Sequence, residues 1–255
     1  MRLFDTHAHL NMKEFDADRE DVVKRASSAG VEFILDVGID AQSSRKAVHL
    51  SRTHPPVYAA AGIHPHEASR AADGDLKSID SMLRDPKVLA LGEIGLDYHY
   101  LFSPKGTQQS LFQEQIEIGV HAGKPLIIHV REAMKDALRI LRETEHPNFR
   151  GVFHCFGGSR EDVPLVLEMG FHISFTGVVT FRNFSKIDIV TAVPLNRLLL
   201  ETDAPYMTPA PLRGQRNEPS MLVHTAKRLA EMYGIPAEEL VSQSTANARA
   251  LFGAA

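Results

Sequence analysis

Eight short apolar runs recur along the chain, and each is followed by a loop or by a segment with helical spacing. Residues 19–29 and 108–121 are two such segments, with apolar side chains every three or four positions. Strands that alternate with helices predict right-handed βαβ units and a parallel sheet. Eight units in 255 residues match the size of a closed (β/α)8 TIM barrel. The predicted strands are residues 3–10, 31–39, 57–63, 88–97, 125–130, 151–156, 171–177 and 198–203.

An open, doubly wound sheet is the alternative fold for this alternation. Such a sheet normally has a glycine-rich phosphate-binding turn after its first strand, whereas the turn here reads THAHLN. No linker, composition shift or low-complexity tract divides the chain. We therefore expect one α/β barrel domain over residues 1–255, closed by two helices over residues 220–233 and 237–252.

The composition is that of an ordinary globular protein, with 44% hydrophobic and 24% charged residues. A net charge of −4 argues against a protein that coats long duplex DNA, but it is compatible with a local site for a nucleic-acid end. The lone Cys155 excludes an intramolecular disulfide and suits a reducing compartment. No apolar run is typical of a signal peptide or long enough to span a membrane. We expect a cytoplasmic monomer without a membrane partner.

The predicted strand over residues 88–97 contains a carboxylate at the end of an apolar row. Alternation predicts that Leu89, Leu91 and Glu93 share one face of this strand. A buried acid is costly unless a positive charge meets it. We predict that Glu93 meets metal ions whose other ligands come from distant parts of the chain.

Barrel active sites lie at the C-terminal ends of the strands, and those ends supply six candidate metal ligands. The six are His7, His9, Glu93, His129, His154 and Asp203. A lone strand histidine is usually a hydrogen-bonded core or surface residue. Likewise, Glu93 alone could pair with an arginine, and Asp203 alone could cap a helix. The occurrence of all six at strand ends, above mostly apolar positions, is what favours a metal site.

Six ligands exceed the shell of one tetrahedral ion and suit two divalent ions about 3.5–4 Å apart. We assign His7, His9 and Asp203 to the first ion, and His129 and His154 to the second. Glu93 bridges the two. Imidazoles suit Zn or Mn and the carboxylates also permit Mg, so the identity of the metal stays open. Four positive charges against two carboxylates favour an anionic transition state over a neutral amide.

Basic side chains in the strand-end loops fit an anionic substrate. His64 and His66 follow the third strand, Arg131 lies just beyond the fifth, and Arg213 follows the eighth. Arginine and histidine donors can hold phosphate oxygens, although basic residues are common on any loop.

Two further residues lie near the predicted ligands. Glu201 is expected to point into the barrel and to orient a ligand from behind. Cys155 is expected to face away from the site, and the chain has no GxSxG elbow, so neither a cysteine nor a serine nucleophile is expected.

The motifs DTHAHL, GIHPH, GEIGLDYHY, PLIIHVRE, FHCFGGS and LLLETDAPY, followed by RGQRNEP, resemble the TatD family of metal-dependent deoxyribonucleases. The resemblance runs in order from residue 4 to residue 252. It implies a TIM barrel of the metallo-dependent hydrolase type, divalent metals and hydrolysis of DNA phosphodiesters, often as an exonuclease. Carried over by motif, the ligands fall on the same six residues. One departure is Gln215, where family members often have lysine, and this departure bears on the grip on nucleic acid rather than on the metals.

We therefore expect a metal-dependent hydrolase that cleaves phosphodiester bonds at single-stranded DNA ends, as a 3′ to 5′ exonuclease. Two ions activate the attacking water, Glu93 bridges them, and Asp203 accepts the proton as general base. His64 and Arg131 steady the phosphate. An amidohydrolase or lactonase on the same scaffold is the alternative, although such enzymes often bridge their metals with a modified lysine. A non-catalytic metal-storing module would need closed coordination.

Overall fold

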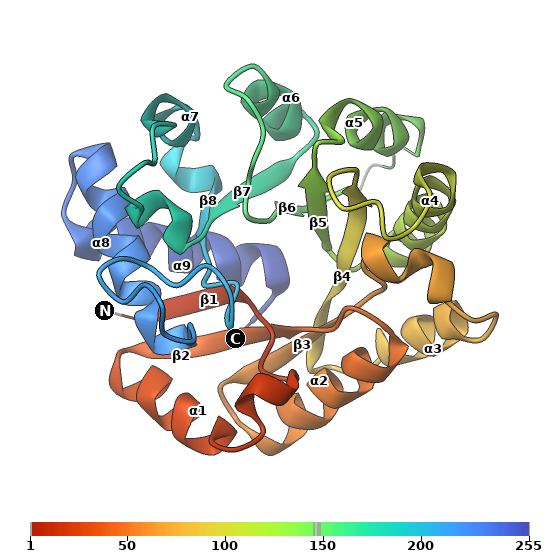
Figure 1. Cartoon of the computed structure of the whole chain (residues 1–255), viewed down its shortest axis with the longest axis horizontal. Helices are drawn as coiled ribbons and strands as arrows, with labels where there is room; N and C mark the ends of the chain where they lie inside the picture. The colour runs from red at the N-terminus through yellow and green to blue at the C-terminus, as the bar shows by residue number, and fades with distance from the viewer. Residues whose placement is uncertain (1, 145, 147–148, 255) are drawn as a thin grey trace.

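The computed structural model describes residues 2–144, 146 and 149–254. Its eight parallel strands form one sheet in the order β1-β2-β3-β4-β5-β6-β7-β8, which curls into a nearly closed barrel inside a ring of helices (Figure 1). The strands are β1 Leu3–Ala8, β2 Val31–Val37, β3 Val57–Ala61, β4 Val88–Asp97, β5 Leu126–Arg131, β6 Gly151–Phe153, β7 Phe171–Phe175 and β8 Leu198–Leu200. Because the strand order follows the chain without reversal, the TIM barrel is confirmed and the doubly wound sheet is excluded.

Helices follow the strands in turn and cover the outside of the sheet. They are α1 Arg19–Ser28, α2 Ala41–Thr53, α3 Asp75–Met82, α4 Lys105–His121, α5 Met134–Glu143, α6 Asp162–Glu168, α7 Ile187–Ala192, α8 Leu222–Tyr233 and α9 Ala237–Phe252. Short 3₁₀ helices are η1 Lys13–Phe15, η2 Pro65–Arg70, η3 Gly177–Thr180, η4 Leu195–Arg197 and η5 Pro219–Met221. Within the part of the chain that the structure describes, no helix has both the length and the apolarity needed to cross a membrane.

Two apolar layers hold the barrel together. The larger layer lies between the sheet and the surrounding helices. The smaller one fills the barrel interior with strand side chains such as Leu35, Ile127 and Leu199. Helix α9 completes this inner layer, because Phe252 packs 6.0 Å from the ring of Phe4 between centroids. One end of the barrel is therefore filled, and the C-terminal strand ends lie at the other.

The alternation predicted for β4 was wrong at one position. Leu89 belongs to the inner apolar layer, but Leu91 belongs to the outer one. The pairing of β4 with β5 shifts register between Leu91 and Ile94, and Gly92 has a φ of +157° in the same stretch. A register shift changes which side chains face inward. Glu93 therefore faces the site through an irregular strand and not through strict alternation.

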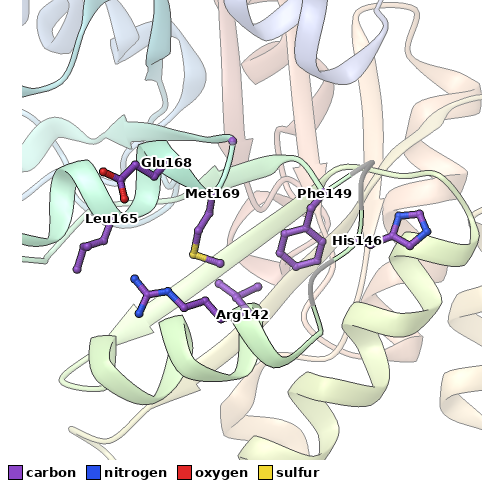
Figure 2. A pocket seen from close by; sticks show the side chains of 8 residues that line it. Arg142, His146, Phe149, Leu165, Glu168 and Met169 are labelled. Carbon is purple, nitrogen blue, oxygen red and sulfur yellow. The ribbon is translucent and has the colours of Figure 1, made fainter.

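A cavity of about 780 Å³ opens between the C-terminal ends of α5 and α6 (Figure 2). Its lining includes Arg142, Phe149, Leu165, Glu168 and Met169. Barrel helices run antiparallel to the strands, so this cavity lies at the N-terminal end of the barrel. It is thus separate from the strand ends where barrel active sites form.

Candidate metal centre

Five strands or the loops directly after them bring the six predicted ligands together at the C-terminal end of the barrel. His9, His154 and Asp203 lie in loops, because β1 ends at Ala8, β6 at Phe153 and β8 at Leu200, all earlier than predicted. The chain leaves the sheet there through left-handed backbone at Cys155, with a φ of 43°, and at Asp203, with a φ of 56°. The convergence of the six side chains does not depend on their lying within the strands.

His7, His9 and Asp203 form the first group of facing atoms. Nε2 of His7 lies 3.2 Å from Nε2 of His9. Nε2 of His9 lies 3.5 Å from Oδ1 of Asp203. Oε2 of Glu93 approaches the same group at 3.3 Å from Nε2 of His7. All four side chains are buried or nearly so, with Asp203 the most exposed.

Glu93, His129 and His154 form the second group. Oε1 of Glu93 lies 2.6 Å from Nε2 of His154 and 2.8 Å from Nδ1 of His129. Those two nitrogens are 3.2 Å apart. The two oxygens of Glu93 thus face two different groups of nitrogens, which is the arrangement expected of a bridging carboxylate.

The buried carboxylates of Glu93 and Asp203 and the imidazoles that face them stabilise each other's charged forms. Burial opposes ionisation of Glu93, but the imidazoles of His154, His64 and His7 outweigh it and hold the pKa of Glu93 well below its usual value. Burial also opposes a charge on His9, yet its hydrogen bond and attraction to Asp203 raise the pKa of His9 to about 9. A divalent cation meets the same electrostatic demand.

The donor atoms fit divalent cations. Nδ1 of His9 lies 2.8 Å from the carbonyl oxygen of Val37 and donates to it, so Nε2 is left to face the site. The potential ligand atoms of His7, His9 and Asp203 all lie within 4.8 Å of one another, and those of Glu93, His129 and His154 lie 2.6–3.2 Å apart. Imidazole nitrogens and carboxylate oxygens are the ligands that Zn and Mn favour. Ligation by the six residues stays a prediction.

His64 also lies in the cluster. Its Nδ1 accepts from the backbone N–H of His66 at 3.1 Å, so in the neutral ring the proton is on Nε2. Burial holds the pKa of His64 well below its usual value, which keeps the ring neutral. Nε2 lies 3.6 Å from Oε1 of Glu93. A donor at this position suits a phosphate oxygen, the role predicted for His64.

Asp97, the last residue of β4, is a residue of the site that the sequence analysis missed. Its Oδ2 lies 2.8 Å from Nε2 of His66 and 3.3 Å from Nε2 of His129. Because Nδ1 of His129 faces Glu93, Asp97 holds the opposite nitrogen and fixes the direction of that ring. Asp97 lies four residues after Glu93 in the motif GEIGLDYHY, and this second carboxylate at the end of the same strand is the sequence feature that could have identified it.

Glu201 lies behind His154. It is fully buried, and its oxygens accept from the backbone N–H of Cys155 at 2.6 Å and from Oγ of Ser174 at 2.7 Å. Oε1 also lies 3.5 Å from Nδ1 of His154. Burial raises the pKa of the Cys155 thiol to about 12, so the thiol is neutral near pH 7.

Asp5 is a second residue that the sequence analysis missed. Its carboxyl oxygens accept from the backbone N–H of Thr202 at 2.9 Å and from Oγ1 of Thr202 at 2.6 Å. Burial raises the pKa of Asp5 to about 7. Asp5 therefore joins β1 to the segment that presents Asp203.

The predicted phosphate contacts on the loops differ in their surroundings. His66 is held by Asp97 at the edge of the cluster. The guanidinium of Arg131 lies 4.7 Å from the centroid of the Tyr100 ring, and that of Arg213 lies 4.0 Å from the Phe181 ring. Both arginines thus rest on aromatic rings at the rim of the barrel.

The loop after β8 that contains Gln215 is tied to the rest of the molecule. Gln215 accepts from Oγ1 of Thr208 through its carbonyl oxygen at 2.8 Å. Next to it, Arg216 bonds both oxygens of Asp18 at 2.8 Å. Nδ2 of Asn217 donates to the carbonyl oxygen of Thr202 at 2.9 Å. These contacts hold the loop in place beside the segment that presents Asp203.

A parallel barrel with imidazoles and carboxylates gathered at its strand ends defines the class of metal-dependent hydrolases. The family model described as TatD related DNase matches residues 4–253, and the chain belongs to this family. The resemblance found in the motifs is therefore confirmed.

Relatives cover almost the whole chain. The "Uncharacterized metal-dependent hydrolase YabD" of Bacillus subtilis is 42% identical over 251 residues, covering 98% of each protein. The "3'-5' ssDNA/RNA exonuclease TatD" of Salmonella typhimurium is 34% identical over 256 residues, also covering 98% of each. Among solved structures, YJJV, a TatD homolog from Escherichia coli K12, has a TM-score of 0.93 at 32% identity and covers 100% of this chain and 99% of its own.

A more distant likeness shows the fold alone. An uncharacterized amidohydrolase from Saccharomyces cerevisiae has a TM-score of 0.86 at 22% identity, covering 99% of this chain and 100% of its own.

Proposed function

We propose that this protein hydrolyses phosphodiester bonds at the ends of single-stranded DNA, as a 3′ to 5′ exonuclease that acts as a monomer. The observation that carries the proposal is Glu93, whose two oxygens face separate groups of nitrogens, 3.3 Å from His7 and 2.6 Å from His154. A carboxylate in this position can bridge two cations. The relative named a 3'-5' ssDNA/RNA exonuclease supports the substrate class.

Two divalent cations, Mg, Mn or Zn, complete the proposed site. His7, His9 and Asp203 would hold one of them, and His129 and His154 would hold the other, with Glu93 shared. When bound, such a pair would stabilise, as Lewis acids, the negative charge that develops on the phosphoryl oxygens and the leaving 3′ oxygen, and would lower the pKa of the attacking water. Asp97 and Glu201 keep the second pair of imidazoles in position from behind.

The side chains of the site then direct the substrate and the proton. Asp203 accepts a proton from the attacking water as general base. The water oxygen forms its bond to phosphorus as the bond from phosphorus to the 3′ oxygen breaks, and the leaving 3′ oxygen takes up a proton. The products are a 5′-mononucleotide and a shortened strand. His64 and Arg131 donate to the phosphate oxygens, and His66 and Arg213 contact neighbouring phosphates.

The test is digestion of a 5′-labelled single-stranded oligonucleotide with Mg, Mn or Zn, each with and without chelator. We expect nucleotides to be released from the 3′ end only when metal is present. Glu93→Gln and His7→Ala should lower the rate by about a thousandfold or more, because groups that stabilise developing charge contribute on this scale. Both variants should also bind less metal, as measured by elemental analysis of the purified protein.

A matched control is His121→Ala, since His121 lies exposed at the end of α4. This variant should keep both its metal content and its activity. Full turnover by metal-stripped Glu93→Gln protein would contradict the proposal. Cleavage of a small ester or amide panel without release of nucleotides would favour the amidohydrolase or lactonase alternative.

A further inference from the structure

An aromatic surface lies beside the metal centre, in the turn between β4 and α4. Tyr100 is 50% exposed, Leu101 48% and Phe102 67%. Among the residues that the structure describes, the other exposed large apolar side chains are Ile187 and Tyr206. All five follow the C-terminal ends of β4, β7 or β8. Exposed apolar side chains gathered at one end of a molecule mark a binding surface, whereas singly scattered ones do not.

Two of these rings form a platform. The rings of Tyr100 and Phe102 are parallel, with an interplanar angle of 1° and centroids 5.4 Å apart. The ring of His66 lies at 89° to that of Phe102, with centroids 4.8 Å apart. The guanidinium of Arg131 lies 4.7 Å from the centroid of Tyr100. The aromatic platform, meaning Tyr100 and Phe102, thus combines flat apolar faces with a neighbouring positive charge.

Buried polar groups hold the platform in one conformation. Oδ1 of Asp97 accepts from the backbone N–H groups of His99 and Tyr100 at 2.9 and 3.0 Å. Nε2 of Gln108 donates to the carbonyl oxygens of Asp97 and Ser103 at 2.9 and 2.8 Å. Both ends of the turn are therefore fixed. Little ordering entropy is lost when a ligand meets a surface that is already in place.

The platform also adjoins the proposed catalytic site. The carboxylate of Asp97 that fixes the turn lies 3.3 Å from His129, a predicted ligand. The ring of His66 contacts both sides, with its centroid 4.8 Å from that of Phe102 and 6.3 Å from that of His129. A group stacked on Phe102 would therefore belong to a nucleotide next to the phosphate at the metal centre.

We infer that Tyr100 and Phe102 stack against unpaired bases that flank the scissile phosphate, and that this stacking selects single-stranded over duplex ends. The inference rests on the proposed nuclease function and specifies its substrate. Aromatic rings accept any base because each base has a π-face, and a nearby arginine adds cation–π attraction. In a duplex, each base is held by its pairing partner, and neighbouring bases cover both faces of all but the terminal pair. The bases that flank the scissile phosphate therefore cannot turn onto the platform.

A tryptophan reporter tests the inference by binding. The chain contains no tryptophan, so Phe102→Trp introduces a single indole on the platform. The control is Tyr58→Trp in β3. Like Tyr100 of the platform, Tyr58 has a cation on its ring, Lys87 Nζ at 4.3 Å, but it lies near the N-terminal end of the barrel. The probes are three phosphorothioate-protected oligonucleotides: a single strand, the same strand with abasic 3′ residues, and a blunt duplex.

We expect the single strand to quench the fluorescence of Phe102→Trp, with little quenching by the abasic strand or the duplex. Tyr58→Trp should show no quenching. In turnover, Phe102→Ala should raise KM for the single strand about tenfold, within the range that one stacked base contributes. Its KM for the abasic strand should not change. His121→Ala, the exposed control change at the end of α4, should leave both values unaltered.

The outcomes separate the platform from the nuclease. Equal quenching by normal and abasic strands, or equal KM changes on both, would overturn the stacking inference while the wild type still cleaves DNA. No release of nucleotides by the wild type would overturn the proposed function. Base-dependent quenching in that case would still support a stacking platform.

Discussion

At the scale of single residues, the tautomers and directions of the imidazoles decide what the site can bind. His9 presents Nε2 because Val37 takes its Nδ1 proton, whereas His129 presents Nδ1 because Asp97 holds its Nε2. His64 carries its proton on Nε2, since Nδ1 accepts from a backbone N–H. Histidine therefore serves in two ways here, as a proposed metal ligand and as a hydrogen-bond donor. The partner of the ring nitrogen that points away from the site decides which of the two it is.

Asp97→Asn should reduce activity without unfolding the protein. Asparagine keeps an acceptor for the backbone N–H groups of His99 and Tyr100, so the turn is retained. It replaces the acceptor that faces His66 and His129 with a donor. We expect kcat and metal affinity to fall by about 10- to 100-fold, the range seen when a partner of a ligand is lost.

Elemental analysis, metal titration and steady-state kinetics would check this expectation. Asp136→Asn is the matched control, because Asp136 bonds the hydroxyl of Tyr98 at 2.8 Å near the same turn but does not hold a proposed ligand. Wild-type metal affinity and kcat in Asp97→Asn would show that Asp97 does not position His129.

At the scale of the element, β4 organises the site, because it supplies Glu93, Asp97 and the start of the aromatic platform. All ten of its residues are buried. Its backbone packs so closely on β5 that a Cβ at Gly95 would lie 2.0 Å from the carbonyl oxygen of His129. Gly95 also has a φ of +140°, a backbone conformation that residues with a side chain rarely adopt. The glycines around Glu93 thus allow the close approach of β4 to its neighbour.

Gly95→Ala should therefore destabilise the protein by about 2–4 kcal/mol, through overpacking and an unfavourable backbone conformation. Urea unfolding followed by circular dichroism would measure this loss. Gly106→Ala is the control, since a Cβ there meets nothing within 4 Å in α4. Its unfolding free energy should stay within about 1 kcal/mol of wild type, or rise slightly. Equal stability of the two variants would contradict the account of β4.

At the scale of the whole molecule, closure of the barrel between β1 and β8 assembles the first group of ligands. Asp5 and Thr202 are 197 residues apart in the sequence, yet their side chains bond at 2.6 Å. The backbone N–H of Asp203 donates to the carbonyl oxygen of His7 at 2.9 Å. An isolated bridge between Ala8 and Ala204 completes the junction. Asp203 meets His7 and His9 because the two ends of the sheet meet.

Thr202→Val should weaken this junction while keeping the shape of the side chain. It removes the hydroxyl that donates to Asp5 and accepts from the backbone N–H of Ala204. We expect a loss of about 1–3 kcal/mol in unfolding free energy, the cost of buried groups left without partners, together with lower metal affinity. Thr191→Val, on an exposed face of α7, should change stability by less than about 0.5 kcal/mol. A Thr202→Val protein as stable as the control would contradict this role.

The sequence by itself determined the barrel, its eight strands and the six residues proposed to bind metal. Apolar period and residue type are local properties, so they can be read along the chain. Strand ends differ from the prediction: β1, β6 and β8 end at Ala8, Phe153 and Leu200, before their predicted limits, because apolar alternation continues past the last residue that pairs with a neighbouring strand. Family membership followed from motifs whose order and spacing the sequence preserves.

Only the tertiary structure decided which nitrogen each imidazole presents, the face on which Leu91 packs, and the roles of Asp5 and Asp97. It also revealed the aromatic platform. These features depend on side-chain torsions, a register shift in β4 and contacts between residues far apart in the chain. The periodicity of apolar residues assigns a residue to a helix or strand. The direction of its polar atoms is set by hydrogen bonds to residues on other strands and loops of the barrel.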